Sequence, residues 1–318
     1  MQTFDLIAFG EVALDIILAG VDKVPRRWSI LGTARAACAV SAGTAGYVAQ
    51  CFAKLGGRVC IIGKIGNDNV GKLVLDGFDR CAVSTKELIV DREADTEIST
   101  VILYKDGNKS SVVSNILPLR PDEFSKRSLT NGRAFHFAGY LLYPNLWGKD
   151  AVSLFKTAKN EGLLVSADPQ MSATEDWSQP FQGILEHLDV LLLDEEEAKN
   201  ISQRKRVNDA IESLLRNGPR IVAVKSGRMG CTVGYGDRIR SIRAYKVKNV
   251  STIGAGDAFD AAFIYGLLQN WSVEKTACFA NVVAAISTTQ YGCMTAIPRA
   301  KTAEKISRGY YHNQPWKR

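Results

Sequence analysis

The chain has 318 residues, of which 46% are hydrophobic and 23% charged. This length exceeds one typical domain of ~100–200 residues but suits a single large α/β unit. The composition lacks the bias of disordered, collagenous or coiled-coil chains. We therefore expect one soluble globular domain over residues 1–318, and a small disulfide-stapled scaffold is excluded.

The formal net charge is +7, but the basic residues are dispersed, apart from Arg204-Lys205-Arg206 and the C-terminal tail. A nucleic-acid partner would need a basic face with interleaved aromatic residues, which this pattern does not predict. No apolar run reaches the ~18–20 residues of a membrane span, and the N-terminus lacks the layout of a signal peptide. We expect a cytoplasmic protein with no membrane partner.

The cysteines and histidines do not indicate a metal centre. The seven cysteines form no CxxC pair, and most of them stand among apolar neighbours. The three histidines are widely separated, and His136 within AFHFAG is typical of a core strand. Neither a zinc site nor a disulfide framework is predicted.

Short apolar runs bounded by Gly, Asp or Pro recur along the chain, and most are separated by segments of helical period. The runs begin at Asp5, Arg58, Ala134, Leu163, Asp189 and Arg220. This alternation predicts an α/β fold with a mainly parallel sheet sandwiched by helices.

Two stretches break this alternation. Residues 96–114 alternate with period two around Asp106-Gly107-Asn108, a sequence typical of a hairpin turn, and residues 13–41 are also strand-like. We expect these lid segments, near 13–41 and 96–114, to form a small β-sheet lid over one end of the main sheet. The alternative for residues 96–114 is an ordinary surface hairpin. A further hairpin is predicted from Cys231 to Ala244.

The stretch VSTIGAGDAF, at residues 250–259, is the most informative for chemistry. Gly254, Ala255 and Gly256 leave backbone N–H groups uncovered at the start of a helix, where the helix dipole favours an anion. Asp257 falls in the first turn of that helix, beside a bound phosphoryl group, where it could accept a hydroxyl proton. The alternative is a tight turn followed by an ordinary helix-start residue.

Several further motifs occur with this one. They are Gly10-Glu11 with Asp15, residues 42–49 (AGTAGYVA), residues 64–68 (KIGND), residues 167–170 (ADPQ), residues 194–197 (DEEE) and residues 225–230 (KSGRMG). Taken together, and over nearly the full length, they resemble the GE…D, GGxxxNVA, GxDxxG, DPN, NxxE and [TK]xGxxG motifs of the ribokinase-like (PfkB) carbohydrate kinases. The signature of that family reads roughly DTxGAGDxF, to which residues 250–259 are similar.

The resemblance implies an ATP-dependent kinase that uses Mg²⁺ and phosphorylates a hydroxyl of a small sugar. It assigns the general base to Asp257 and the anion hole to Gly254, Ala255 and Gly256. The other implied site residues are Asp15, Gly43, Thr44 and Tyr47 for substrate, Lys225, Gly227, Gly230, Thr252, Asn281 and Gly292 for nucleotide, and Asp194 and Glu197 for metal. Carboxylates three residues apart on one helical face can hold a hydrated Mg²⁺. The alternative is a solvated helix start.

The sequence departs from the family pattern at several positions. Tyr47 replaces an asparagine that binds sugar hydroxyls in the family, and Ser251 replaces the first aspartate of the signature. Ala42, Gln170 and Asp194 are the other substitutions. Many members bind a monovalent cation through that aspartate and the carbonyls of a loop that here resembles residues 287–296. The missing carboxylate predicts a weak or empty cation site.

The acceptor is expected to be neutral. Residues 42–49 contain no Lys or Arg, and Met171 and Ser172 stand where acid-sugar kinases of the family tend to carry an arginine. The alternatives are a nucleoside kinase of the same family, or a catalytically degenerate protein that binds a nucleotide or sugar. A nicotinamide dehydrogenase is disfavoured, because GEVALD stands where G-x-G-x-x-G would follow the first strand. An exposed lid edge would also allow a homodimer.

Overall fold

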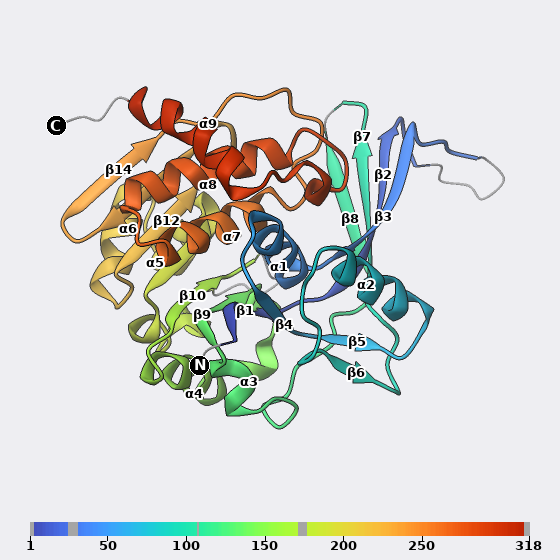
Figure 1. Cartoon of the computed structure of the whole chain (residues 1–318), viewed down its shortest axis with the longest axis horizontal. Helices are drawn as coiled ribbons and strands as arrows, with labels where there is room; N and C mark the ends of the chain where they lie inside the picture. Colours follow the sequence, from blue (N-terminus) through green and yellow to red (C-terminus); the bar gives the residue numbers. More distant parts are fainter. Residues whose placement is uncertain (1–2, 25–30, 107, 171–176, 315–318) are drawn as a thin grey trace.

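The computed structural model describes residues 3–24, 31–106, 108–170 and 177–314. Its main sheet has eight strands among these residues (Figure 1). In spatial order they are β14 (Arg238–Ile242), β13 (Cys231–Tyr235), β12 (Ile221–Lys225), β11 (Val190–Asp194), β10 (Leu164–Asp168), β9 (Gly132–Ala138), β1 (Phe4–Gly10) and β4 (Val59–Ile62). All pairings from β12 to β4 are parallel, and β13 and β14 add an antiparallel hairpin. The predicted mainly parallel sheet and the hairpin near Gly236 are both confirmed.

The central strands are apolar on both faces because each face packs on its own core. In β1, Leu6 and Ala8 belong to one hydrophobic cluster, whereas Ile7 and Phe9 belong to the other, and all four are fully buried. Side chains of a strand alternate between faces, so a sheet covered on both sides requires uninterrupted apolar runs. This is the physical origin of the runs recognised in the sequence.

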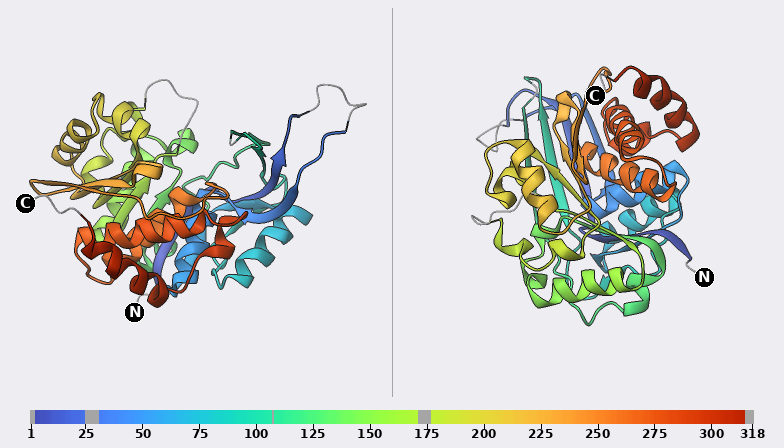
Figure 2. Two further views of the ribbon diagram at one scale, coloured as in Figure 1. Left: turned by 90° about the horizontal axis from the view of Figure 1, so that it is seen from above. Right: turned by 90° about the vertical axis from the view of Figure 1, so that its left-hand side faces the viewer.

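Helices cover both faces of the main sheet (Figure 2). One layer contains α1 (Thr44–Leu55), α7 (Ala255–Leu268), α8 (Val273–Ser287) and α9 (Ala300–His312), and the other contains α3 (Lys126–Thr130), α4 (Lys149–Asn160), α5 (Glu195–Ser202) and α6 (Val207–Arg216). Short 3-10 helices cover Tyr140–Leu142, Pro144–Leu146, Gln179–Phe181, Leu185–His187, Gly227–Met229 and Cys293–Ala296. No helix within the described ranges is long and apolar enough to cross a membrane.

The two strand-like excursions form one separate sheet, which we call the small sheet. Its strands, in spatial order, are β3 (Ala36–Ala42), β2 (Ala13–Val21), β7 (Ile98–Tyr104) and β8 (Lys109–Val113). It extends away from the helices that cover the main sheet (Figure 2, left). The expectation of a small separate sheet is thus confirmed, although residues 25–30 and Gly107 of these excursions lie outside the described residues.

The remaining elements support the small sheet. Helix α2 (Asn69–Arg80) packs against β2 and β3, and β5 (Lys64–Gly66) pairs with β6 (Ile89–Asp91). The Asp68 carboxylate caps α2 by accepting the Gly71 N–H at 2.6 Å, and it also accepts the Thr96 N–H and hydroxyl, each at 2.8 Å. Asp68 therefore fixes the chain where it enters β7.

Candidate active site

A cleft of about 1020 Å³ lies at the carboxyl ends of the central strands. The last residues of β10, β11 and β12 are Asp168, Asp194 and Lys225, and all three line it. Ligands of open α/β sheets bind at this end, where each strand ends and a loop leads to the next helix. The volume is at the upper end of the range for small-molecule sites, so a nucleotide and a second small substrate can fit together.

The cleft brings together predicted residues from widely separated parts of the chain. Those that line it are Asp15, Gly43, Thr44, Tyr47, Asp194, Glu197, Lys225, Gly227, Gly230, Thr252, Gly254, Ala255, Gly256, Asp257 and Asn281. Gly292, predicted to bind nucleotide, is not among the lining residues. A Cβ there would lie 3.1 Å from Val40 of β3, so Gly292 lies against the small sheet, and its assignment to nucleotide stays a prediction.

The predicted anion hole is the N-terminus of α7. Gly254 is the N-cap residue, with a left-handed backbone (φ 70°, ψ 7°) that favours glycine. The first N–H groups of a helix have no partner within the helix and point outward together. The Ala255 amide already donates to the Thr252 carbonyl at 3.3 Å, so the Gly256 amide is better placed to receive an anion.

Asp257 lies in the first turn of α7 and is half-buried in the cleft. Burial raises the pKa of its carboxyl group well above the ordinary value, and the Asp168, Glu11 and Asp15 carboxylates raise it further, while Lys225 lowers it. A carboxylate with a raised pKa is a stronger base once it is ionised. The environment therefore suits proton acceptance from a hydroxyl group.

Lys225 occupies the back of the cleft between two carboxylates. Its Nζ lies 2.6 Å from Asp168 Oδ2 and 3.0 Å from Asp260 Oδ2, and its side chain is 15% exposed. Burial opposes its charge, but Asp168 and Asp260 raise the pKa of Lys225 well above its ordinary value. The ammonium is thus fully charged at neutral pH. Asp260 lies about one turn beyond Asp257 on α7, and its pairing with Lys225 was not predicted from the sequence.

At the other end of the cleft, Asp15 of β2 and Tyr47 of α1 form a hydrogen bond. The Tyr47 hydroxyl donates to Asp15 Oδ2 at 2.6 Å, and both side chains are buried. Burial raises the pKa of Asp15 to about 6, with Tyr47 lowering it and Glu11 raising it. Tyr47 thus orients the carboxylate predicted to bind substrate, and its hydroxyl is committed to that carboxylate.

Close backbone contacts fix the start of α1 at this end of the cleft. Gly43 has φ 84° and ψ 155°, and a Cβ there would lie 2.4 Å from the Glu11 carbonyl oxygen. The Thr44 N–H donates to Glu11 Oε2 at 2.9 Å. Thr44 lines the cleft, and its buried hydroxyl meets no partner within the described residues. That hydroxyl lies toward Gly139, where a Cβ would be 2.8 Å from it, so the role of Thr44 toward substrate stays a prediction.

Glu97 is a buried carboxyl group near Glu11 that the sequence analysis did not single out as a candidate site residue. It lies just before β7, is 1% exposed, and has one carboxyl oxygen without a partner in the described structure. Burial and the adjacent Glu11 carboxylate raise the pKa of Glu97 to about 10, so this group is neutral at pH 7. The only signal available was a charged residue within the otherwise alternating TEIST segment.

The predicted metal pair forms a capping box at the start of α5. Asp194 Oδ1 accepts the Glu197 N–H at 2.8 Å, and Glu197 Oε2 accepts the Asp194 N–H at 2.7 Å. Each carboxylate thus uses one oxygen for the helix start. Mg²⁺ in phosphoryl-transfer sites is held by one or two carboxylates together with substrate phosphates and water, so the remaining oxygens fit that mode. The described residues contain no cluster of three potential ligands that would hold a metal alone.

The predicted nucleotide residues form the turns beside β12 and β14. Gly227 and Gly230 have positive φ angles of 50° and 104°, and the tight turn between them leads into β13. Asn281 Nδ2 donates to the Arg243 carbonyl at 3.3 Å and contacts the Tyr310 hydroxyl at the same distance. Asn281 therefore anchors the backbone that follows β14. It also lines the cleft.

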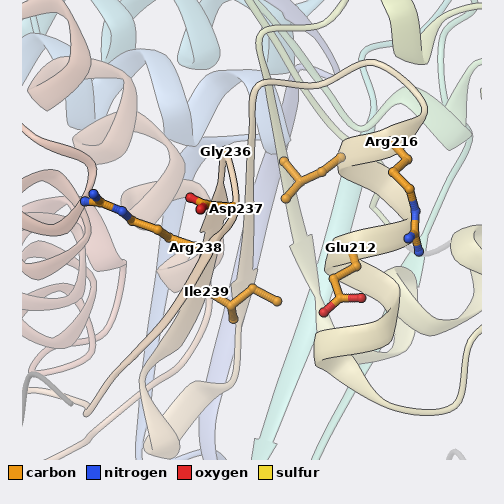
Figure 3. A pocket seen from close by; sticks show the side chains of 7 residues that line it. Glu212, Arg216, Gly236, Asp237, Arg238 and Ile239 are labelled. Carbon is orange, nitrogen blue, oxygen red and sulfur yellow. The ribbon is translucent and has the colours of Figure 1, made fainter. Parts of the chain in front are cut away.

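A second, smaller hollow of about 310 Å³ lies between α6 and the β13–β14 hairpin (Figure 3). It shares no lining residue with the cleft. Arg238 extends away from Glu212 and Arg216 across the hollow, so the charged groups do not converge on one point (Figure 3). None of the predicted site residues lies there.

Comparisons with known proteins identify the family and the fold. The model of the pfkB family carbohydrate kinases matches residues 6–300. Probable fructokinase-5 of Arabidopsis thaliana is 26% identical, with 95% of this chain and 96% of the relative covered. The crystal structure of a putative ribokinase from Agrobacterium tumefaciens has a TM-score of 0.85 at 19% identity, with 98% and 99% covered. A putative ribokinase II from E. coli in complex with ATP and Mg²⁺ gives 0.81 at 21% identity, with 96% and 99% covered.

The parallel sheet with its small antiparallel sheet is the ribokinase-like fold, and the matches to the family model and to the fructokinase place the chain among the phosphotransferases of the sugar kinase class. With the family model matched over nearly the whole length, the chain belongs to the pfkB family of carbohydrate kinases. The family resemblance drawn from the sequence motifs is confirmed. The individual residue roles remain predictions.

Proposed function

We propose that the protein transfers the γ-phosphoryl group of ATP to a hydroxyl of a small neutral sugar. The observation that carries this proposal is the meeting, in one cleft, of Asp257 at the N-terminus of α7 with Asp15, Thr44 and Tyr47, which β2 and α1 supply. An acceptor bound to Asp15 and Thr44 would present a hydroxyl toward Asp257. The whole chain acts as one kinase domain, with the small sheet as its lid.

In the proposed mechanism, Asp257 accepts the proton of the acceptor hydroxyl as its oxygen attacks the γ-phosphorus. The amides at the start of α7 donate to the phosphoryl oxygens, where negative charge develops. Closure of the small sheet excludes water, which would otherwise compete as acceptor. Asp194 and Glu197 would hold Mg²⁺, which supplies charge neutralisation of the phosphates.

The charges at the acceptor end favour a neutral sugar. Glu11 and Asp15 line the acceptor end. Among the described residues of the small-sheet strands, Lys109 is the cation that lines the cleft. Met171 and Ser172, where acid-sugar kinases of the family tend to carry an arginine, lie outside the described residues. A negatively charged acceptor would meet these carboxylates at close range and would need a bidentate or point cation to offset them.

An acceptor screen tests the proposed function. Thermal shift with a nonhydrolysable ATP analogue selects ligands among neutral sugars, including fructose and ribose, nucleosides and sugar phosphates, and ADP release then measures turnover. We expect turnover of at least one neutral sugar. Turnover of nucleosides alone would identify a nucleoside kinase, turnover of sugar phosphates alone would overturn the neutral acceptor, and binding without any turnover would indicate a degenerate kinase.

We predict that acceptor affinity depends on the ionisation of Asp15. Its carboxylate accepts hydrogen bonds from sugar hydroxyls, and because its pKa is about 6, affinity falls as the pH drops through that value. Acceptor KM, measured between about pH 5 and about pH 8, should rise on the acid side. Removing the Tyr47 hydrogen bond with Tyr47→Phe should move the midpoint to higher pH. A KM that stays constant across this range would contradict the role of Asp15.

We also predict little dependence on monovalent cations. Ser251 is buried and offers no carboxylate, and the Thr288 carbonyl beside it already accepts the Val250 and Ser251 N–H groups at 2.7 and 3.0 Å. A K⁺ ion there would lack the anionic ligand that offsets its dehydration. Turnover should be similar in Na⁺, K⁺ and a large organic cation at constant ionic strength, and Ser251→Asp should introduce K⁺ activation. A strong K⁺ requirement in the unmodified protein would refute this.

The homodimer through the small sheet stays a proposal. Strands β3 and β8 are the sheet edges, and every residue of β8 is exposed. Exposed edges of this kind pair readily with a second copy. Sedimentation measurements over a range of concentrations would establish whether a dimer forms.

A further inference from the structure

The ammonium group of Lys225 lies directly against the predicted anion hole. A Cβ built on Gly256 would be 3.6 Å from Lys225 Nζ, so the open side of this glycine faces the ammonium. Lys225 ends β12, whereas Gly256 is the second residue of α7, and both line the cleft. The fold therefore places a permanent cation next to backbone amides that can receive a phosphoryl group.

Two carboxylates hold this cation in place. Asp260 contacts Nζ through both oxygens, at 3.1 and 3.0 Å, and is 1% exposed, while Asp168 contacts it at 2.6 Å. A free lysine side chain would have to be ordered on binding a ligand, at a cost in side-chain entropy. Here that ordering is complete before any ligand arrives. Three fixed oxygens direct the ammonium toward the start of α7.

Lys225 could serve only to neutralise the buried Asp168 and Asp260, but that role does not explain its position. A lysine that served only that purpose would be best placed away from the ligand space, with its own exposure eliminated. Instead, Lys225 keeps 15% of its side chain exposed and lines the cleft beside Gly256. A preorganised cation at the position where phosphoryl charge develops is the arrangement that lowers a transfer barrier.

We propose that Lys225 is a catalytic cation of this site, contacting the γ-phosphoryl group at the start of α7, and that Asp260 is the residue that positions it. This inference rests on the proposed kinase function and extends it. Asp260 acts only through Lys225, because its own oxygens are both turned toward the ammonium. Asp168, which also lines the cleft, completes the clamp.

The test compares two variants by calorimetry with ADP and with a nonhydrolysable ATP analogue. Lys225→Met alone would leave two buried carboxylates without a counter-charge and is expected to disturb folding. The double variant Lys225→Met, Asp260→Asn removes one positive and one negative charge, so the net charge of the cluster is unchanged. Asp260→Asn alone is the matched control, since it keeps the cation. Thermal melting checks that each variant folds.

In the unmodified protein, we expect the ATP analogue to bind more tightly than ADP. The double variant should lose ~10-fold or more of this preference, the loss expected for one charge-assisted contact to the γ-phosphate, with ADP affinity nearly unchanged. Asp260→Asn should retain the preference but lower kcat, because the ammonium is less firmly placed. A double variant that keeps the full preference, or that fails to fold while Asp260→Asn folds, would overturn the role of Lys225.

The same measurements separate this inference from the proposed function. If the unmodified protein bound neither nucleotide, the kinase function would fail, and the role of Lys225 with it. If it bound both and turned over a sugar, but the double variant behaved like the unmodified protein, only the role of Lys225 would fail.

Discussion

Replacing Asp257 with asparagine is expected to lower turnover by ~10² or more, the lower end of what a positioned acid–base group supplies. Asparagine has nearly the same size and keeps a polar side chain in the first turn of α7, so the helix start remains. It cannot accept the hydroxyl proton. Because we propose that the loop amides, and not this carboxylate, bind the nucleotide, affinity for an ATP analogue should stay nearly constant in calorimetry while steady-state turnover of the identified acceptor falls.

The pH dependence gives an independent check on Asp257. Burial and the neighbouring carboxylates raise the pKa of Asp257. The fraction of Asp257 that is ionised therefore increases as the pH rises, and turnover of the unmodified enzyme should increase with the pH. The variant should lose this dependence. Asp150→Asn, which alters the first turn of α4 instead, is the control and should leave turnover unchanged. Near-normal turnover of Asp257→Asn would remove Asp257 from the mechanism.

The sequence was sufficient to predict the parts of this structure that depend on local pattern. The strands β10, β11 and β12 are short apolar runs with sharp boundaries, and their order in the sheet follows the chain. The glycines before Asp257 require a turn followed by a helix, which is a local requirement. Parallel strands then place their carboxyl ends together, so the position of the cleft follows from the fold class.

Contacts between distant segments could not be predicted in this way. Lys225 binds Asp168, 57 residues earlier, and Asp260, 35 residues later, and nothing in the local pattern around any of these residues specifies that pairing. These ion pairs depend on how α7 packs against the main sheet, and that packing is set by contacts between distant segments. By contrast, the sequence predicts a helix start at Asp194, as the alternative to a metal pair, and the capping box that Asp194 forms with Glu197 is a local contact with a known sequence signature.

Replacing Gly43 with alanine is expected to destabilise the protein by about 2–6 kcal/mol, from two additive causes. The backbone at Gly43, with φ 84° and ψ 155°, lies in a region that is essentially restricted to glycine and costs other residues about 1–3 kcal/mol. In addition, the new Cβ would lie 2.4 Å from the Glu11 carbonyl oxygen and 2.7 Å from the Val12 Cα, both of which are backbone atoms. Relieving that overlap must move the start of α1 away from the segment between β1 and β2. Denaturant unfolding measures the total.

Gly56→Ala provides the matched control for this prediction. Gly56 ends α1 with φ 102°, yet a Cβ there would meet no atom within 4 Å, so this substitution carries backbone strain without a clash. Gly56 has the left-handed conformation (φ 102°, ψ 11°), so the difference between the two variants reports the clash at Gly43, for which overpacking predicts about 1–3 kcal/mol, together with the additional backbone strain of the Gly43 conformation. Because Thr44 and Tyr47 follow Gly43 on α1, any folded Gly43→Ala protein should also bind its acceptor more weakly, whereas Gly56→Ala should bind it normally. Equal destabilisation with unchanged acceptor affinity would show that the close approach of Gly43 to Glu11 does not set the geometry of the acceptor end.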